Sequence, residues 1–280
     1  MLTRVLTALV GIPLAVVLIF RDDPMPFAVA IGLVSALGAL EFYGNVRKAG
    51  VRPVEWAGVA AVVLLAVSAR SYDRSSIGSL FPAVLTLLLI LSFFVELIRK
   101  ERAPIVNIGA TIFGAIYVGW LISHIVALRQ ISRPIQIGSY ETQVGAVMVM
   151  LTFLCTWASD TGAYFIGRTY GKKKLTPKLS PNKTIEGSVA GFVCSILIAV
   201  IAGTIIKLPP QHSLALGAIF GLLTQLGDLS ESAIKRELGI KDFGTIVPGH
   251  GGILDRFDSL LFTGPAAFYY AVLFLSNWPK

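Results

Sequence analysis

Charged residues are scarce in this sequence: Asp, Glu, Lys and Arg make up 14% of its 280 residues, against roughly 25% in an average soluble domain. Hydrophobic residues make up 55%, and the mean hydropathy is +0.75. A soluble fold cannot bury that much apolar surface, and a disordered chain is poor in apolar residues. The composition therefore excludes both classes and indicates a polytopic membrane protein.

Cysteine is rare as well. The two cysteines, Cys155 and Cys194, both lie inside apolar runs, so they cannot form the disulfide framework of a small secreted domain. We interpret them as packing residues within the membrane. A P-loop is also excluded, because neither of the two clusters of Gly and Lys, at 167–174 and 183–187, has the required glycine spacing.

Nine apolar runs occupy most of the chain, and most of them approach the roughly 20 residues that a helix needs to cross a bilayer. The two short ones are 54–69 and 213–227, and the second continues into a helix with a polar face. We therefore predict an all-α, polytopic integral membrane protein with about nine transmembrane helices, and counts of eight or ten stay open. The runs are 5–20, 25–44, 54–69, 80–98, 105–127, 144–166, 187–206, 213–227 and 258–276.

Basic residues are divided unequally between the two sides of these spans. Seventeen of the 24 Lys and Arg residues fall on one side and seven on the other. Because Lys and Arg concentrate in cytoplasmic loops, we predict the N-terminus inside and the C-terminus outside. The net charge of +8 has the same origin and indicates no nucleic-acid partner. A cleaved signal peptide is the alternative for the first run, although Arg21-Asp22-Asp23-Pro24 follows it without a cleavage-type site.

Polar residues divide the chain into two parts. Residues 1–143 form N-terminal transmembrane helices with short linkers, and residues 144–280 form a C-terminal region that we predict to be catalytic. That region contains two dense polar segments, 167–187 and 228–258, both on the inner side. In the N-terminal part, Glu41 and Glu96 lie near the inner ends of their spans, and we interpret them as interfacial.

Asp160 lies late in the sixth apolar run, beside Ser159, Thr161 and Gly162. An ionisable side chain that faced lipid there would cost at least about 2.5–3.5 kcal/mol. We therefore expect Asp160 to face a polar cavity. The alternative is a carboxylate at a helix end that reaches the membrane interface.

A basic loop follows, in which Ser180-Pro181-Asn182 predicts a turn and a helix start. Lys183 and Thr184 then lie at the beginning of the next helix. Helix N-termini favour anions, and a Lys at that place suits phosphate. The alternative is a basic loop that only anchors the topology.

The second polar segment carries more chemistry. One helix face carries Asp228, Ser232 and Lys235, which are spaced i, i+4, i+7. The alternative is a cytosolic extension of the helix with a solvent-exposed polar face, which would show the same pattern. The turn Pro248-Gly249-His250-Gly251-Gly252 follows. Its glycines let the backbone approach a ligand closely, and the last span begins just after it.

Two further carboxylates follow this turn. Asp255 and Asp258 are spaced i, i+3 and share a face of the incoming helix. With Asp228 they can supply three carboxylates to one site, a set that suits Mg²⁺ beside substrate phosphates. The alternative is that Asp255 pairs with Arg256 or a neighbouring Lys at the interface.

These residues resemble the signature of the phosphatidate cytidylyltransferases, also called CDP-diacylglycerol synthases. At motif level the resemblance covers about residues 156–258. It rests on Asp160-Thr-Gly-Ala-Tyr164, on Ser180-Pro-x-Lys183-Thr184-x-Glu186-Gly187 and on Ser232-x-x-Lys235-Arg236-x4-Lys241-Asp242-x5-Pro248-x-His250-Gly251-Gly252-x-x-Asp255-Arg256-x-Asp258. It implies the reaction of CTP with phosphatidic acid to give CDP-diacylglycerol and pyrophosphate. It also implies Mg²⁺, and a second cation is left open.

From the residues and the resemblance together we assign roles. The predicted metal ligands are Asp228, Asp255 and Asp258. The predicted catalytic residues are Lys235, Arg236, His250 and Asp160. The predicted substrate-binding residues are Lys183, Thr184, Ser180, Ser232, Lys241, Gly251, Gly252 and Arg256.

The expected partners are CTP, phosphatidic acid and membrane lipid, with a homodimer left open. The expected location is the cytoplasmic membrane, with the active site on the cytoplasmic side. Two other functions stay open at this point: a CTP-dependent lipid or polyprenol kinase, and a secondary transporter.

Overall fold

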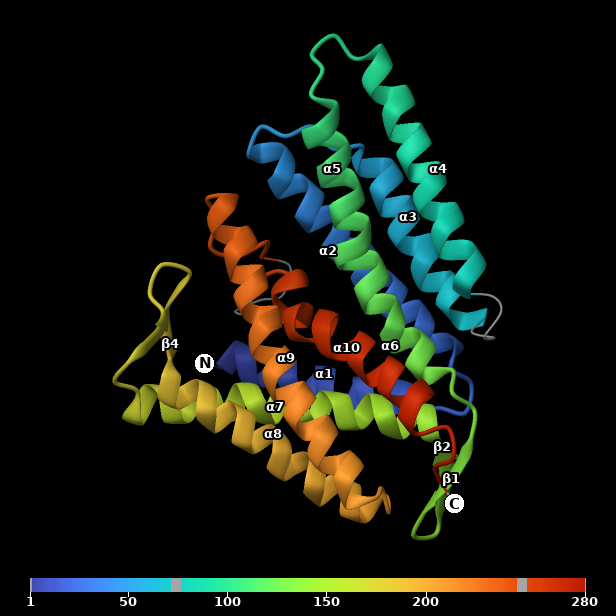
Figure 1. Cartoon of the computed structure of the whole chain (residues 1–280), viewed down its shortest axis with the longest axis vertical. Helices are drawn as coiled ribbons and strands as arrows, with labels where there is room; N and C mark the ends of the chain where they lie inside the picture. The colour runs from blue at the N-terminus through green and yellow to red at the C-terminus, as the bar shows by residue number, and fades with distance from the viewer. Residues whose placement is uncertain (1, 72–76, 246–250, 280) are drawn as a thin grey trace.

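The computed structural model describes residues 2–71, 77–245 and 251–279, and within them the fold is predominantly helical (Figure 1). Two short antiparallel hairpins interrupt the helices. In chain order the elements are α1 Leu2–Phe20, α2 Met25–Lys48, α3 Glu55–Ser68, the 3₁₀ turn η1 Ala69–Ser71, α4 Ile77–Ile98, α5 Pro104–Gly114, the π-helical turn η2 Ala115–Trp120, α6 Leu121–Arg129, β1 Pro134–Ile137, β2 Tyr140–Gln143, α7 Val144–Tyr170, β3 Lys174–Thr176, β4 Ser180–Thr184, α8 Ile185–Ile205, α9 Pro210–Glu237 and α10 Leu254–Phe274.

Each of the nine predicted apolar runs is helical over most of its length, so the predicted class, a polytopic α-helical membrane protein, is confirmed. Among the described residues, seven helices are long and apolar enough to cross a membrane. The described part of α1, Leu9–Phe20, and α3, Glu55–Ser68, are shorter apolar stretches, so the count of nine spans stays a prediction. The expected extension of the run 213–227 is present, because α9 continues to Glu237.

Small residues bring α7, α8 and α9 into close contact. A Cβ atom on Gly187 of α8 would lie 2.7 Å from the carbonyl oxygen of Ala163 in α7, and one on Gly217 of α9 would lie 2.6 Å from Cα of Ile196 in α8. Membrane helices that approach this closely are held by van der Waals packing of their backbones, for which glycine leaves room. The three helices therefore form a tight unit. The polar segment 167–187 connects α7 to α8, and the polar segment 228–258 begins in α9.

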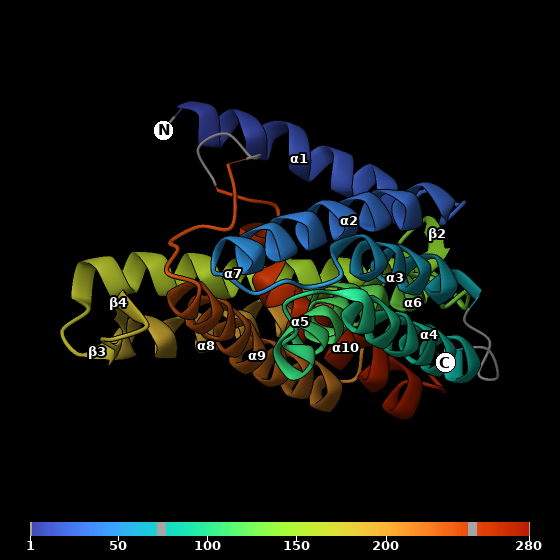
Figure 2. The same ribbon diagram turned by 90° about the horizontal axis from the view of Figure 1, so that it is seen from above.

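The two parts of the sequence share one core. Its buried residues come from α2, from η2 and α6, from α7 and from α10, and they include Phe42, Tyr43, Val118, Ile125, Met148, Leu254 and Leu261. In Figure 1, α7 runs steeply across the direction of α3 and α4, and Figure 2 shows from above that α1 and α2 lie along one side of the bundle. The N-terminal helices thus pack directly on the helices that carry the polar segments 167–187 and 228–258.

One end of the bundle gathers the segments that we predict to be outside. The Arg129 side chain donates to the carbonyl of Ile19 at 2.6 Å, and Arg133 donates to that of Ser276 at 2.7 Å. Trp278 donates to the carbonyl of Lys207 at 3.2 Å. These contacts tie the segments after α1, α6, α8 and α10 together at one end.

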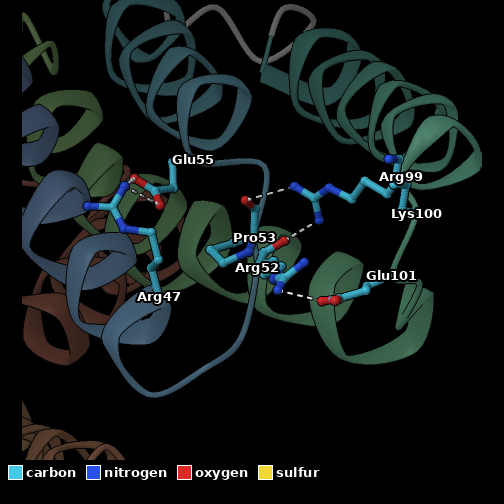
Figure 3. A pocket seen from close by; sticks show the side chains of 7 residues that line it. All are labelled: Arg47, Arg52, Pro53, Glu55, Arg99, Lys100 and Glu101. Atoms are coloured by element: carbon cyan, nitrogen blue, oxygen red, sulfur yellow. Dashed lines mark hydrogen bonds and ion pairs between the residues drawn. The ribbon is translucent and has the colours of Figure 1, made fainter.

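The segments between α2 and α3 and between α4 and α5 also meet, and they line a pocket of about 460 Å³ (Figure 3). Its arginines are paired with carboxylates: Arg47 lies 3.0 Å from Glu55, and Arg52 lies 2.5 Å from Glu101. These segments belong to the base-rich side of the sequence partition.

The two hairpins were not predicted. The strands β1 and β2 pair antiparallel around Gly138 and Ser139, and β3 pairs with β4. The prediction of a turn at Ser180-Pro181-Asn182 is wrong, because these residues lie in the strand β4. The predicted helix start is correct: Thr184 is the N-cap of α8, and its hydroxyl accepts the backbone N–H of Gly187 at 3.1 Å.

Candidate functional site

Three carboxylates meet where the end of α9 crosses the beginning of α10. One oxygen atom from each of Asp228, Glu231 and Asp258 lies within 4.8 Å of the other two. Asp228 and Asp258 are half-buried, whereas Glu231 is only 1% exposed. Within the part of the chain that the structure describes, Oε1 of Glu231 is buried without a hydrogen-bond partner. We call these three residues the carboxylate cluster.

A glycine makes this convergence possible. Gly227 precedes Asp228, and a Cβ atom there would lie 2.7 Å from the carbonyl oxygen of Asp258 and 3.0 Å from Cα of Ser259. The backbones of α9 and α10 therefore touch at the cluster. Asp228 and Glu231 are one helical turn apart, so they present their carboxylates on the same side of α9.

Cations and a further acid surround the cluster. Nζ of Lys183, at the end of β4, lies 2.6 Å from Oδ2 of Asp228. Asp160 of α7 is exposed, and its carboxylate is close enough to Asp258, Asp228 and Lys183 to feel their charges. The structure thus brings Asp160, Lys183, Asp228 and Asp258 together from four different elements, as expected for residues that share a site.

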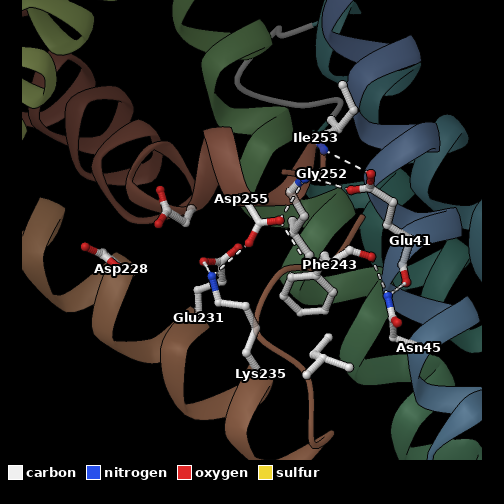
Figure 4. A network of polar contacts seen from close by, with 12 residues as sticks. Glu41, Asn45, Asp228, Glu231, Lys235, Phe243, Gly252, Ile253 and Asp255 are labelled. Carbon is white, nitrogen blue, oxygen red and sulfur yellow. Dashed lines mark hydrogen bonds and ion pairs between the residues drawn. The ribbon is translucent and has the colours of Figure 1, made fainter. Parts of the chain in front are cut away.

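Lys235 joins the cluster to Asp255 (Figure 4). Its Nζ forms an ion pair with Glu231 and lies 2.8 Å from Oδ1 of Asp255. The other oxygen of Asp255 accepts the backbone N–H groups of Phe243 at 2.8 Å and of Gly252 at 2.9 Å. Both oxygens of Asp255 are therefore engaged in protein contacts, and this residue is not one of the three in the carboxylate cluster.

The polar residues of β4 and of the end of α9 have other neighbours. Thr184 is buried and caps α8. Ser180 is half-buried in the hairpin, and Ser232 is buried in α9. The exposed Arg236 donates to the carbonyls of Leu179 at 3.2 Å and Ile240 at 2.9 Å, so its guanidinium binds backbone rather than the cluster. Lys241 and Arg256 are exposed.

The Gly-rich turn is described only from Gly251 onward. Gly251 has a φ of +89°, which favours glycine. A Cβ atom on Gly252 would lie 2.6 Å from Oε2 of Glu41, so the close approach that glycine permits here is to another part of the chain. His250 lies outside the described residues.

Sequence reasoning missed two acidic residues. Glu231 follows Asp228 by three residues, which is also the spacing between Asp255 and Asp258. This spacing could have identified Glu231 as a further candidate ligand. Glu41 was given no role beyond an interfacial position, yet it is only 9% exposed and accepts backbone N–H groups at the start of α10. No local pattern signals a contact between residues more than 200 positions apart.

The donor set of the cluster suits a hard divalent cation. All three residues offer carboxylate oxygens, the ligand class of Mg²⁺, and the unpartnered Oε1 of Glu231 is a buried acceptor that a cation would satisfy. Two oxygens bound to one Mg²⁺ lie no more than about 4.2 Å apart. The observed limit of 4.8 Å is slightly wider, a difference that small side-chain rotations or a retained metal water can cover.

The chain matches the Cytidylyltransferase family over residues 2–274. It is 33% identical over 290 residues to a phosphatidate cytidylyltransferase of Synechocystis sp., covering 97% of each chain. It is 33% identical over 280 residues to a phosphatidate cytidylyltransferase of Bacillus subtilis, covering 98% of this chain and 97% of the relative. A Staphylococcus epidermidis protein of the same name is 49% identical over 129 residues, which are 45% of this chain and 50% of that protein.

Proposed function

Because the chain belongs to the cytidylyltransferase family, we infer that it transfers the cytidylyl group of CTP to phosphatidic acid. The products are CDP-diacylglycerol and pyrophosphate, and the reaction belongs to phospholipid biosynthesis. The observation that carries this conclusion is the family match across nearly the whole chain, together with full-length relatives that are named for this activity. A transporter and a CTP-dependent kinase are no longer favoured.

The reaction makes modest demands on acid–base chemistry. A phosphate oxygen of phosphatidic acid attacks the α-phosphorus of CTP, a new P–O bond forms, and the bond to the leaving pyrophosphate breaks. That oxygen is already anionic near neutral pH, so no strong base has to activate it. The site must instead align two anionic substrates and neutralise their charge.

We propose that Asp228, Glu231 and Asp258 hold Mg²⁺. Bound there, the ion would neutralise charge on the phosphates and stabilise an in-line displacement. Support comes from the convergence of the three carboxylates and from the unpartnered oxygen of Glu231. Asp255, a metal ligand in the sequence-based prediction, is proposed here to place Lys235 beside the cluster, because both of its oxygens are already engaged.

The lysines at the edges of the cluster supply positive charge for the substrates. Lys183 lies against Asp228 on one side, and Lys235 lies against Glu231 on the other. Both ammonium groups are therefore within reach of phosphates that approach the carboxylates, and we assign them to phosphate binding. Arg236, Lys241 and Arg256 are exposed and remain proposed contacts for the outer phosphates of CTP.

We propose that the cluster opens to the cytoplasm from the cell membrane. The basic residues concentrate on the side that carries the segments 167–187 and 228–258, and such loops are cytoplasmic as a rule. CTP is made in the cytosol, so this orientation gives the nucleotide direct access. The lipid substrate would reach the same site from the bilayer.

Product analysis with labelled CTP tests the function. The purified protein is mixed with Mg²⁺ and phosphatidic acid, and with CTP that carries the radiolabel at either its α- or its γ-phosphate. Cytidylyl transfer predicts that the α-label enters the lipid and the γ-label enters pyrophosphate. Transfer of the γ-label to the lipid would show a kinase instead, and an Asp258→Asn variant serves as the inactive control.

A further inference from the structure

A carboxylate from the N-terminal part of the chain lies at the start of α10. Oε1 of Glu41 in α2 accepts the backbone N–H of Ile253 at 3.0 Å, and Oε2 accepts that of Leu254 at 3.0 Å (Figure 4). The first N–H groups of a helix have no partner within that helix. A negative charge there is also favoured by the helix dipole. Glu41 therefore caps α10 from a different helix.

The next turn of α2 holds the other end of the same loop. Nδ2 of Asn45 donates to the carbonyl of Phe243 at 2.6 Å and to that of Glu41 at 2.8 Å. The segment that links α9 to α10 is thus bound to α2 at both of its described ends. Phe243 packs near Phe42 of α2, with ring centroids 6.3 Å apart, which adds an apolar contact to the polar ones.

From this loop the contacts continue to the carboxylate cluster. Phe243, whose carbonyl Asn45 binds, and Gly252, which directly precedes the Ile253 that Glu41 binds, both donate their backbone N–H groups to Asp255. Asp255 pairs with Lys235, and Lys235 pairs with Glu231 of the cluster. The contacts to Asp255, Lys235 and Glu231 are hydrogen bonds or ion pairs, and Gly252 is joined to Ile253 by the peptide bond. A shift of the loop would therefore displace the Lys235 ammonium from its place beside the cluster.

We propose that Glu41 and Asn45 are positioning residues for the cytidylyl transfer. They fix the backbone on both sides of the loop, and through Asp255 they set Lys235 against the carboxylate cluster. This inference rests on the proposed function. It also gives the N-terminal part of the chain a role in the reaction that no motif of the sequence indicates. Glu41 touches no residue of the cluster, so its effect must pass through the loop.

The test compares two buried carboxylates of the N-terminal part. Glu41→Gln keeps the shape but removes the charge and one of two acceptors at α10. Glu96→Gln is the control: Glu96 is 3% exposed, forms an ion pair with Arg99 and accepts from Asn107 at 3.0 Å and from the backbone of Ala103 at 3.3 Å, and these contacts do not lead to the cluster. Both variants are purified and assayed for CDP-lipid formation at varied CTP and Mg²⁺.

We expect Glu41→Gln to raise the KM for CTP and the Mg²⁺ concentration at half-maximal rate by about tenfold, equivalent to about 1.4 kcal/mol. Glu96→Gln should leave both within about twofold, although it can lower the yield of folded protein. Glu41→Asp should recover part of the loss, because it keeps the charge. A second readout is the rise in melting temperature on adding Mg²⁺, which should shrink in Glu41→Gln and not in Glu96→Gln.

A purely structural role predicts otherwise. If Glu41→Gln lowers only the amount of folded protein, with KM, Mg²⁺ dependence and Mg²⁺ stabilisation unchanged, the proposal is wrong. Should Glu41→Gln fail to fold, Asn45→Ala takes its place with the same expectations. If neither Glu41→Gln nor Asn45→Ala folds while Glu96→Gln does, the contacts of Glu41 and Asn45 serve folding alone, and the proposal is wrong. A wild-type protein that makes no CDP-lipid would refute the proposed function instead, and the Mg²⁺ stabilisation would still decide the role of Glu41.

Discussion

Replacing Gly227 by Ala should damage the site without touching any of its charged groups. The new Cβ atom would lie 2.7 Å from the carbonyl oxygen of Asp258 and 3.0 Å from Cα of Ser259. Both neighbours are backbone atoms, so no side-chain rotation relieves the clash, and α9 and α10 have to separate by several tenths of an ångström. Overpacking of this kind costs about 1–3 kcal/mol of stability.

The same separation widens the carboxylate cluster, because Asp228 follows the mutated residue and Asp258 carries the contacted carbonyl. A misplacement of about 1 Å in an active site can cost about a hundredfold in rate. For roughly half that displacement we expect about a tenfold loss of kcat and a higher Mg²⁺ requirement. The assay is CDP-diacylglycerol formation at saturating CTP and phosphatidic acid, with Mg²⁺ varied.

Gly109→Ala in α5 is the control, because a Cβ atom there would meet nothing within 4 Å. It should be as active as the wild type and slightly more stable, since alanine favours a helix by about 0.5–1 kcal/mol over glycine. If Gly227→Ala folds and keeps wild-type kcat and Mg²⁺ dependence, the contact between α9 and α10 does not set the geometry of the site and our reasoning is refuted.

Three further substitutions test separate parts of the account. Lys183→Arg should lower CDP-lipid formation about tenfold, because a planar guanidinium does not replace a point charge at a fixed distance. Lys173→Arg, at an exposed lysine, should leave the activity unchanged. If the two variants are equally active, Lys183 only anchors the topology. Thr184→Ala should lower stability by about 0.5–2 kcal/mol through loss of the α8 N-cap, as measured by thermal unfolding, and Thr184→Ser should restore it. Asp255→Asn should raise the KM for CTP by displacing Lys235 while leaving the number of bound Mn²⁺ ions unchanged; a loss of bound metal would make Asp255 a ligand.

Helices that depend on local hydrophobicity were predictable. The nine apolar runs are helical over most of their length, and the continuation of α9 beyond residue 227 followed from its polar face. The hairpin β1–β2 was missed, although Gly138-Ser139 between alternating residues is a hairpin signal. Long apolar runs are the dominant pattern in a membrane protein sequence, and the two four-residue strands between them give a much weaker pattern.

The site was predictable where the residues are neighbours in sequence. Asp228 and Asp258 lie on α9 and α10, two helices that follow one another in the chain, and both belong to one polar segment whose carboxylates indicated a shared site. Glu231 was passed over because its neighbour Ser232 fitted the spacing i, i+4, i+7 equally well. Glu41 could not be found at all, since its partners at 253 and 254 depend on how α2 packs against α10. Tertiary packing of this kind leaves no periodic trace in the sequence.

The central claim is that Asp228, Glu231 and Asp258 together hold a divalent cation. Titration of the purified protein with Mn²⁺, followed by electron paramagnetic resonance, measures that binding without any turnover. The account predicts a bound Mn²⁺ that Mg²⁺ displaces, with affinity lowered at least about tenfold in each of Asp228→Asn, Glu231→Gln and Asp258→Asn. Undiminished Mn²⁺ binding in all three folded variants would contradict it.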